Sequence, residues 1–85
     1  NAPQIVAPAD GREYLVEADE PPEMLLACHA DNDVQQVYWY INDRFYKTAK
    51  TNERLFFRPE PGEVKISCSD DKGRNTNIRI TVKAL

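Results

Sequence analysis

The chain has 85 residues and a net charge of −3, from 11 basic and 14 acidic side chains. This length supports one domain with one core, predicted over residues 3–85, with residues 1–2 interpreted as the remnant of an expression tag. The charges form no basic stripe, which argues against nucleic acid as a partner. No apolar run approaches the 18 residues of a membrane span, so the domain itself is not expected to enter a membrane.

Short strands separated by turn signals follow one another along the chain, and no stretch repeats apolar residues at helical spacing for three turns. The predicted strands are residues 4–7, 14–16, 24–30, 36–41, 45–48, 55–57, 64–69 and 77–83. Pro3 and Pro8 bracket the first strand, which is therefore expected at a sheet edge, where prolines are tolerated.

Turn-forming residues account for the connections between these strands. Asn42-Asp43 tolerates left-handed backbone and predicts a tight hairpin. Gly73 supplies a left-handed residue for a last hairpin turn over residues 70–74. An acidic loop is expected at 17–23, which contains Pro21-Pro22, and the remaining connections are a turn at Asp10-Gly11, a turn at 31–33, a polar loop at 49–53 and a Pro/Gly corner at 59–62.

The last two strands show the alternation of apolar and polar residues most clearly. The apolar positions are Val64, Ile66 and Cys68 in one strand, and Ile78, Ile80 and Val82 in the other. Such strands have one covered face and one face in water. Seven or eight of them at this spacing predict an all-β fold, an immunoglobulin-like antiparallel β-sandwich of about seven strands.

Two cysteines flank the only tryptophan, and Cys28, Trp39 and Cys68 each centre a short run with strand character. A Cys, a Trp about a dozen residues later and a Cys on a late strand are typical of immunoglobulin-type sandwiches, in which a disulfide joins the sheets and the indole packs against it. We therefore predict a Cys28–Cys68 disulfide, Trp39 as its core packing partner and an oxidising compartment. Two buried free thiols are the alternative.

The outer face of the strand at 36–41 carries Gln36, Tyr38 and Tyr40, which are expected beside Tyr46 or Phe45 of the next strand. Tyrosine is frequent at binding surfaces because one end of its ring is apolar and the other polar. The same rings also form ordinary cross-strand pairs on a half-exposed sheet. Gln36, Tyr38, Tyr40 and Tyr46 are therefore candidate binding residues, for a protein or for the sugar rings of a glycan strand.

Four short motifs follow one another in the chain: Ile-x-x-Pro-x-x-Gly from Ile5, Trp-Tyr-x-Asn from Trp39, Pro61-Gly62, and Asp-x-x-Gly-Arg from Asp70. In this order they resemble the small C-terminal domain of bifunctional penicillin-binding proteins, over residues 3–82. One departure is Asp43-Arg44, which stands where the central turn of that family often has Asp-Gly.

The resemblance implies a periplasmic parent enzyme with a glycosyltransferase domain, a transpeptidase domain and one membrane anchor, acting on peptidoglycan. In that family the C-terminal domain is an accessory module without established chemistry, so no cofactor is expected. The implied partners are a periplasmic protein, with a bacterial alpha-2-macroglobulin suggested by the family, or the catalytic domains of the same chain. The chain begins without a signal-peptide pattern, so we expect it to be cut from this longer protein.

The sequence also contains a possible nucleophile motif, Ser-x-x-Lys from Ser69 to Lys72, with Lys47-Thr48-Ala49 one residue away from Lys-Thr-Gly. Such motifs are meaningful only in the right structural context. Here Ser69 ends a predicted strand and Lys72 lies in a predicted hairpin turn. We therefore expect no catalytic residue in this chain.

The remaining candidates are His29 and two acidic pairs. His29 is expected to point toward solvent, opposite to Cys28, and no orienting group is evident for it. Asp31-Asn32-Asp33 and Asp70-Asp71 could offer oxygen ligands, but they lack the glycine and the bidentate glutamate of a calcium loop. Turn capping by their own side chains is the preferred interpretation, and no metal site is expected.

Overall fold

The computed structural model describes residues 1–17, 19–20 and 23–85, and these residues form eight strands and no helix. The strands are β1 Gln4–Ala7, β2 Glu13–Val16, β3 Met24–His29, β4 Gln36–Ile41, β5 Arg44–Lys50, β6 Leu55–Phe57, β7 Gly62–Asp70 and β8 Asn75–Ala84. No helix able to cross a membrane is therefore found in the described part of the chain. The predicted Pro21-Pro22 segment of the acidic loop lies outside the described residues.

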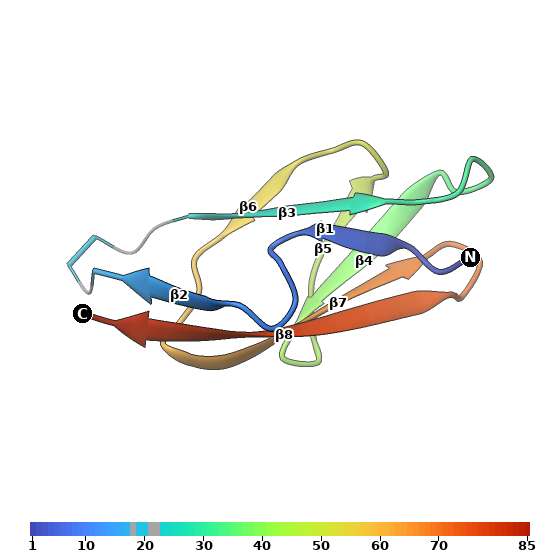
Figure 1. Ribbon diagram of the computed structural model, residues 1–85. Coiled ribbons are helices and arrows are strands. Elements are labelled where there is room, and N and C mark those ends of the chain that lie inside the picture. The colour runs from blue at the N-terminus through green and yellow to red at the C-terminus, as the bar shows by residue number, and fades with distance from the viewer. Residues whose placement is uncertain (18, 21–22) are drawn as a thin grey trace.

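The strands form two layers, which Figure 1 shows one above the other. One sheet has three strands in the order β1-β3-β6, and the other has five in the order β2-β8-β7-β4-β5. The molecule is elongated, with extents of 42 × 20 × 19 Å, and the two ends of the chain lie at opposite ends of it (Figure 1). The predicted immunoglobulin-like β-sandwich is confirmed.

Apolar side chains at alternate strand positions fill the space between the sheets. Trp39 of β4, Leu26 of β3 and Ile66 of β7 are completely buried. β8 contributes Ile80 and Val82, which are almost completely buried. Burial of apolar area is the main favourable term in folding. The apolar face of each strand therefore points into this layer, and the other face points outward.

One strand pair differs from the antiparallel prediction, because β2 pairs parallel with β8. β1 pairs antiparallel with β3, and Pro8 ends this ladder because proline has no backbone N–H. The chain then crosses to the other sheet without reversing its direction (Figure 1). Asp10 fixes the crossing, since the Arg79 N–H donates to its Oδ1 at 3.0 Å and the Gly11 N–H donates to the Arg79 carbonyl at 2.8 Å.

The predicted hairpin between β4 and β5 is confirmed, with Asn42 and Asp43 at φ of 51° and 66°. Positive φ at both residues is what a two-residue hairpin turn of this type requires. The Asn42 Oδ1 also accepts a hydrogen bond from the Lys65 N–H at 2.8 Å. β5 continues to Lys50, however, through residues 49 and 50 of the predicted polar loop, because Ala49 faces the core and is buried.

Candidate functional site

The outer face of the five-stranded sheet carries two uncharged rows of side chains across β5, β4, β7 and β8. The strand register aligns Phe45, Tyr40, Ser67 and Asn77 in one row, and Thr48, Tyr38, Ser69 and Asn75 in the next. We call these eight residues the aromatic–hydroxyl face. Rings stand on its β4–β5 side, and hydroxyl and amide groups stand on its β7–β8 side.

The most exposed ring of this face is Phe45, which is 58% exposed. It meets Tyr40 edge-on, with ring centroids 5.8 Å apart and the planes at 73°. Edge-to-face contact is a favourable geometry for aromatic pairs, and it holds both rings in place. The pair therefore presents an apolar surface with little freedom left to lose on binding.

Tyr38 lies beside this pair on the same strand, where the Gln36 Nε2 donates a hydrogen bond to its hydroxyl at 2.8 Å. Tyr38 and Tyr40 are both partly exposed, and Gln36 is exposed. The structure thus brings together three of the four residues that the sequence predicted for a binding surface: Gln36, Tyr38 and Tyr40.

Tyr46 does not join them, because it follows Phe45 in β5 and its side chain is on the inner side of the sheet. Trp39 pairs with Lys47 and Tyr40 pairs with Phe45, which leaves Tyr46 as the extra residue. Its ring packs against the core, and its hydroxyl donates to the Phe56 carbonyl of β6 at 2.6 Å. Of the two alternatives for the neighbour on β5, the structure therefore selects Phe45.

Trp39 and the two cysteines meet in the core. Trp39 and Cys68 are fully buried cross-strand neighbours on β4 and β7, whereas Cys28 is on β3 of the other sheet and is half-buried. In this structure the two sulfur atoms are not bonded to each other. A hydrogen bond with Cys68 lowers the pKa of Cys28, and the same hydrogen bond together with burial raises the pKa of Cys68. The thiols thus contact each other across the sheets, and their disulfide stays a prediction.

The acidic pairs singled out in the sequence converge on Arg74. Its guanidinium lies 2.7 Å from the Asp70 Oδ2, 3.2 Å from the Asp33 Oδ1 and 3.5 Å from the Asp31 Oδ2. Asp71 instead accepts the Gln35 N–H at 3.0 Å. The carboxylates of Asp31, Asp33 and Asp70 are thus compensated by the guanidinium, whereas the Asp71 Oδ1 is buried without a hydrogen-bond partner among the described residues.

Asp70 also organises the turn that holds the Ser-x-x-Lys spacing. Its Oδ1 accepts the backbone N–H groups of Lys72 and Arg74, each at 2.9 Å. Burial alone would raise the pKa of Asp70, but these hydrogen bonds and the Arg74 guanidinium lower it below its usual value. Ser69 lies in β7 and Lys72 in the hairpin turn, so neither has the helical setting of a penicillin-binding nucleophile.

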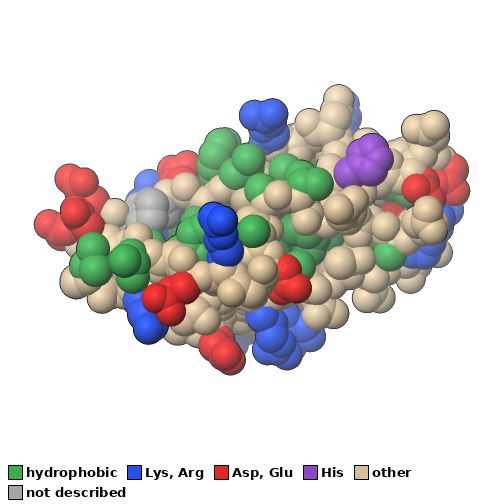
Figure 2. Space-filling model, viewed as in Figure 1, with side chains coloured by type: hydrophobic (Ala, Val, Ile, Leu, Met, Phe, Trp, Pro, Cys, Tyr) green, Lys and Arg blue, Asp and Glu red, His purple; other side chains and the backbone are tan. Residues whose placement is uncertain are grey.

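His29 is exposed at the end of β3, and Figure 2 shows the histidine side chain on the molecular surface. The same view shows acidic and basic side chains interspersed. The predicted solvent-facing position of His29 is therefore confirmed.

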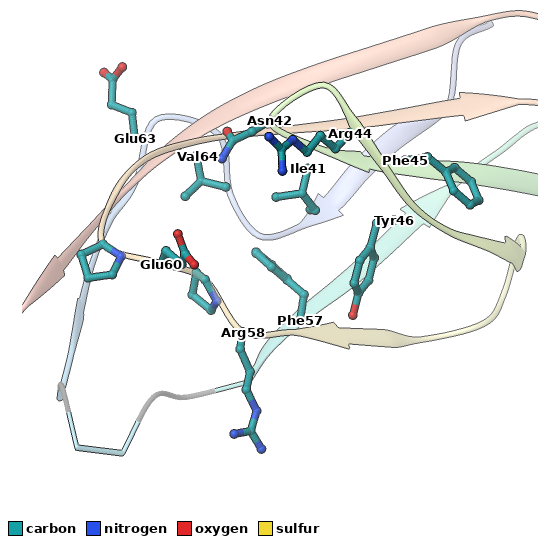
Figure 3. Close-up of a pocket in the computed structure, with 12 residues that line it drawn as sticks. Ile41, Asn42, Arg44, Phe45, Tyr46, Phe57, Arg58, Glu60, Glu63 and Val64 are labelled. Carbon is teal, nitrogen blue, oxygen red and sulfur yellow. The ribbon is translucent and has the colours of Figure 1, made fainter.

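A second surface feature lies where the β4–β5 turn faces the β6–β7 loop. A half-open groove of about 640 Å³ lies between them. Figure 3 shows its lining residues. They are Ile41, Asn42, Arg44, Phe45, Tyr46, Phe57, Arg58, Pro59, Glu60, Pro61, Glu63 and Val64. This groove was not predicted from the sequence, because its two walls belong to separate connections in the chain.

The two-layer arrangement, with a parallel β2–β8 pair beside antiparallel strands, defines a fibronectin III-like or immunoglobulin-like sandwich. The solved fibronectin(III)-like modules of Clostridium thermocellum CbhA match this fold with a TM-score of 0.76 at 14% sequence identity, over 98% of this chain and 97% of that chain. The model of the penicillin-binding protein C-terminus family matches residues 1–80, and the chain belongs to this family. A search of curated proteins finds no match.

Proposed function

We propose that this chain is a non-catalytic accessory domain of a bifunctional peptidoglycan synthase, which docks the parent enzyme on another protein or positions its catalytic domains. Family membership supports a penicillin-binding parent, and the sequence resemblance favours one of the penicillin-binding protein 1C kind. The parent would be anchored in the inner membrane, with this domain in the periplasm. A bacterial alpha-2-macroglobulin is the proposed foreign partner.

The observation that carries the proposal is the Phe45–Tyr40 pair, with Phe45 exposed, at the β5 end of an uncharged row of side chains. Aromatic residues are enriched and charged residues depleted at the centres of protein interfaces. Rigid rings also lose little conformational entropy on binding. A protein surface of matching shape is therefore the favoured occupant of the aromatic–hydroxyl face.

Cross-linking in the full-length enzyme tests this proposal. A photo-reactive residue at position 48, within the face, should capture either a foreign periplasmic protein or the transpeptidase domain of the same chain. Phe45→Ala and Tyr40→Ala should reduce this capture at least tenfold, since buried aromatic anchors dominate interface energies. The matched control is Phe56→Ala, because Phe56 is 52% exposed but lies on the other sheet. Equal capture by Phe45→Ala and wild type would refute docking through this face.

A second candidate function is binding of a glycan strand to the same face. It is favoured by one specific feature, the hydroxyl and amide groups of Ser67 and Asn77 in register with the ring of Tyr40. Such a row could combine stacking of a sugar ring with hydrogen bonds to its hydroxyls. Retention of the domain on purified cell-wall sacculi, lost in Tyr40→Ala, would support this function. No retention would exclude it.

The non-catalytic assignment has its own test. Incubation of the chain with a β-lactam and with a donor peptide should give no turnover above a boiled control. Any turnover that Ser69→Ala abolishes would overturn the assignment.

A further inference from the structure

The groove between the β4–β5 turn and the β6–β7 loop has the dimensions of a small-ligand site. Its volume of about 640 Å³ falls within the range of roughly 300–1,000 Å³ that is typical of ligand pockets. Its lining does not include Tyr38, Ser67 or Asn77 of the aromatic–hydroxyl face. Only Phe45 belongs to both surfaces.

The floor and one wall of the groove are apolar and fixed in position. Phe57 and Val64 are 5% and 3% exposed and belong to the core. The ring of Tyr46 is anchored by its hydrogen bond to the Phe56 carbonyl. Pro59 is buried as well, and proline lacks the backbone freedom that would let this loop collapse into the groove.

Two opposite charges on the rim of the groove lack an ion-pair partner among the described residues: Arg44 on the hairpin and Glu60 on the loop. Figure 3 shows the two groups on different sides of the Phe57 ring. The other charges are accounted for, since Arg58 pairs with Glu23 at 3.4 Å and points away from the groove, and Glu63 also points away.

We propose that this groove binds a short peptide that carries a free carboxylate and a free ammonium group, with Arg44 on the carboxylate, Glu60 on the ammonium group and an apolar side chain against Phe57. Guanidinium groups bind carboxylates through paired hydrogen bonds. Glu60 would repel a polyanion and Arg44 would repel a simple cation, so the charge arrangement selects for a ligand with both charges. The natural source of the peptide rests on the proposed function, because uncrosslinked peptides of peptidoglycan carry both groups.

Titration of the isotopically labelled chain with L-lysyl-D-alanyl-D-alanine, followed by amide chemical shifts, tests the site. We expect shifts to concentrate at Ile41, Phe57 and Val64, with a dissociation constant in the millimolar range, as suits a partly open groove. The C-terminal amide of the peptide, which lacks the carboxylate charge, and its Nα,Nε-diacetyl form, which lacks both ammonium charges, should each bind about fivefold more weakly.

Two variants assign the contacts. Arg44→Gln should weaken binding of the free acid about fivefold but leave binding of the peptide amide unchanged. Glu60→Gln should weaken binding of the free peptide but not of the diacetyl form. Arg54→Gln and Glu63→Gln are the matched controls, because Arg54 does not line the groove and Glu63 points away from it.

The outcomes separate this inference from the proposed function. Shifts that are confined to the groove and need about fivefold more peptide in the charge variants support it, whatever happens to partner capture in Tyr40→Ala. No shifts at 20 mM peptide, or shifts of equal size in Arg44→Gln and wild type, would overturn it. If Tyr40→Ala loses partner capture but binds the peptide as the wild type does, both proposals are supported and the two surfaces act separately.

Discussion

Asp70 illustrates how one residue can determine a local structure in this domain. Its side chain is fully buried, yet it accepts two backbone N–H groups and the Arg74 guanidinium. A buried carboxylate is tolerated only when it is compensated in this way. The β7–β8 turn, together with Asp31 and Asp33 on the β3–β4 loop, is thus organised around one ion cluster.

This cluster predicts a loss of stability in acid. The pKa of folded Asp70 lies below the unfolded value of about 3.9. Its carboxylate therefore stabilises the fold above that pH, and the contribution is lost as the pH falls through the lower folded pKa. Asp70→Asn should lower the urea midpoint at pH 7 and flatten its decline between about pH 5 and pH 2. The exposed Asp43→Asn serves as control, and an unchanged slope in Asp70→Asn would contradict the prediction.

Tyr46 gives a second prediction at this scale. Tyr46→Phe removes the hydroxyl that donates to the Phe56 carbonyl, which should destabilise the domain by ~1 kcal/mol. Tyr38→Phe should change the stability much less, because its hydroxyl contacts only the exposed Gln36. Denaturant titration of both variants measures the difference. Equal effects would mean that the Tyr46 bond adds nothing beyond a surface contact.

The same residue shows where reasoning from sequence stops. Strict alternation along β5 fails beyond Tyr46, because the bulged residue reverses the pattern and places Thr48 beside Tyr38 and Ala49 in the core. The bulge carries no glycine or proline that would reveal it. Gln36, Tyr38 and Tyr40 were predictable as one face because β4 is regular over their length.

At the level of elements, the turns with a strong backbone preference were the most predictable. Asn42-Asp43 and Gly73 occupy positive φ, as predicted from their residue types. The parallel pairing of β2 was not predictable, because the pattern of residues 14–16 fixes a strand but not its partner. The groove was hidden for a similar reason, since the β4–β5 turn meets the β6–β7 loop only after both sheets have formed.

The β4–β5 turn yields a prediction of its own. Asp43 sits at a φ of 66°, a conformation that costs most residues ~1–2 kcal/mol and glycine almost nothing. Its ion pair with Lys65, at 2.8 Å and largely exposed, is worth ~0–1 kcal/mol. Asp43→Gly should therefore stabilise the domain by ~0.5 kcal/mol, and by more in high salt, which screens the lost pair. Thermal unfolding at two salt concentrations measures this, and destabilisation at both would refute it.

For the molecule as a whole, the predicted disulfide between Cys28 and Cys68 bears on the free energy of unfolding. The thiols contact each other from opposite sheets, and a disulfide closing a loop of about 40 residues is worth ~4 kcal/mol in the chain-entropy model. Oxidised protein should therefore unfold at a markedly higher denaturant concentration than the reduced protein. The double variant Cys28→Ala/Cys68→Ala should unfold at the same denaturant concentration as the reduced protein, and oxidant should not change that concentration. Intact mass of protein from the cell envelope, with and without thiol labelling, shows which state exists; two labelled thiols would contradict the disulfide.

The parallel pairing of β2 with β8 also determines how the domain would carry mechanical load. Tension applied through the two ends of the described chain would pull the start of β2 and the end of β8 in opposite directions along one axis. The backbone hydrogen bonds of their four paired positions would then be loaded in shear and would have to break together, instead of one after another as in an unzipping hairpin. Such an arrangement gives a small sandwich a resistance to stretching that its equilibrium stability alone would not reveal.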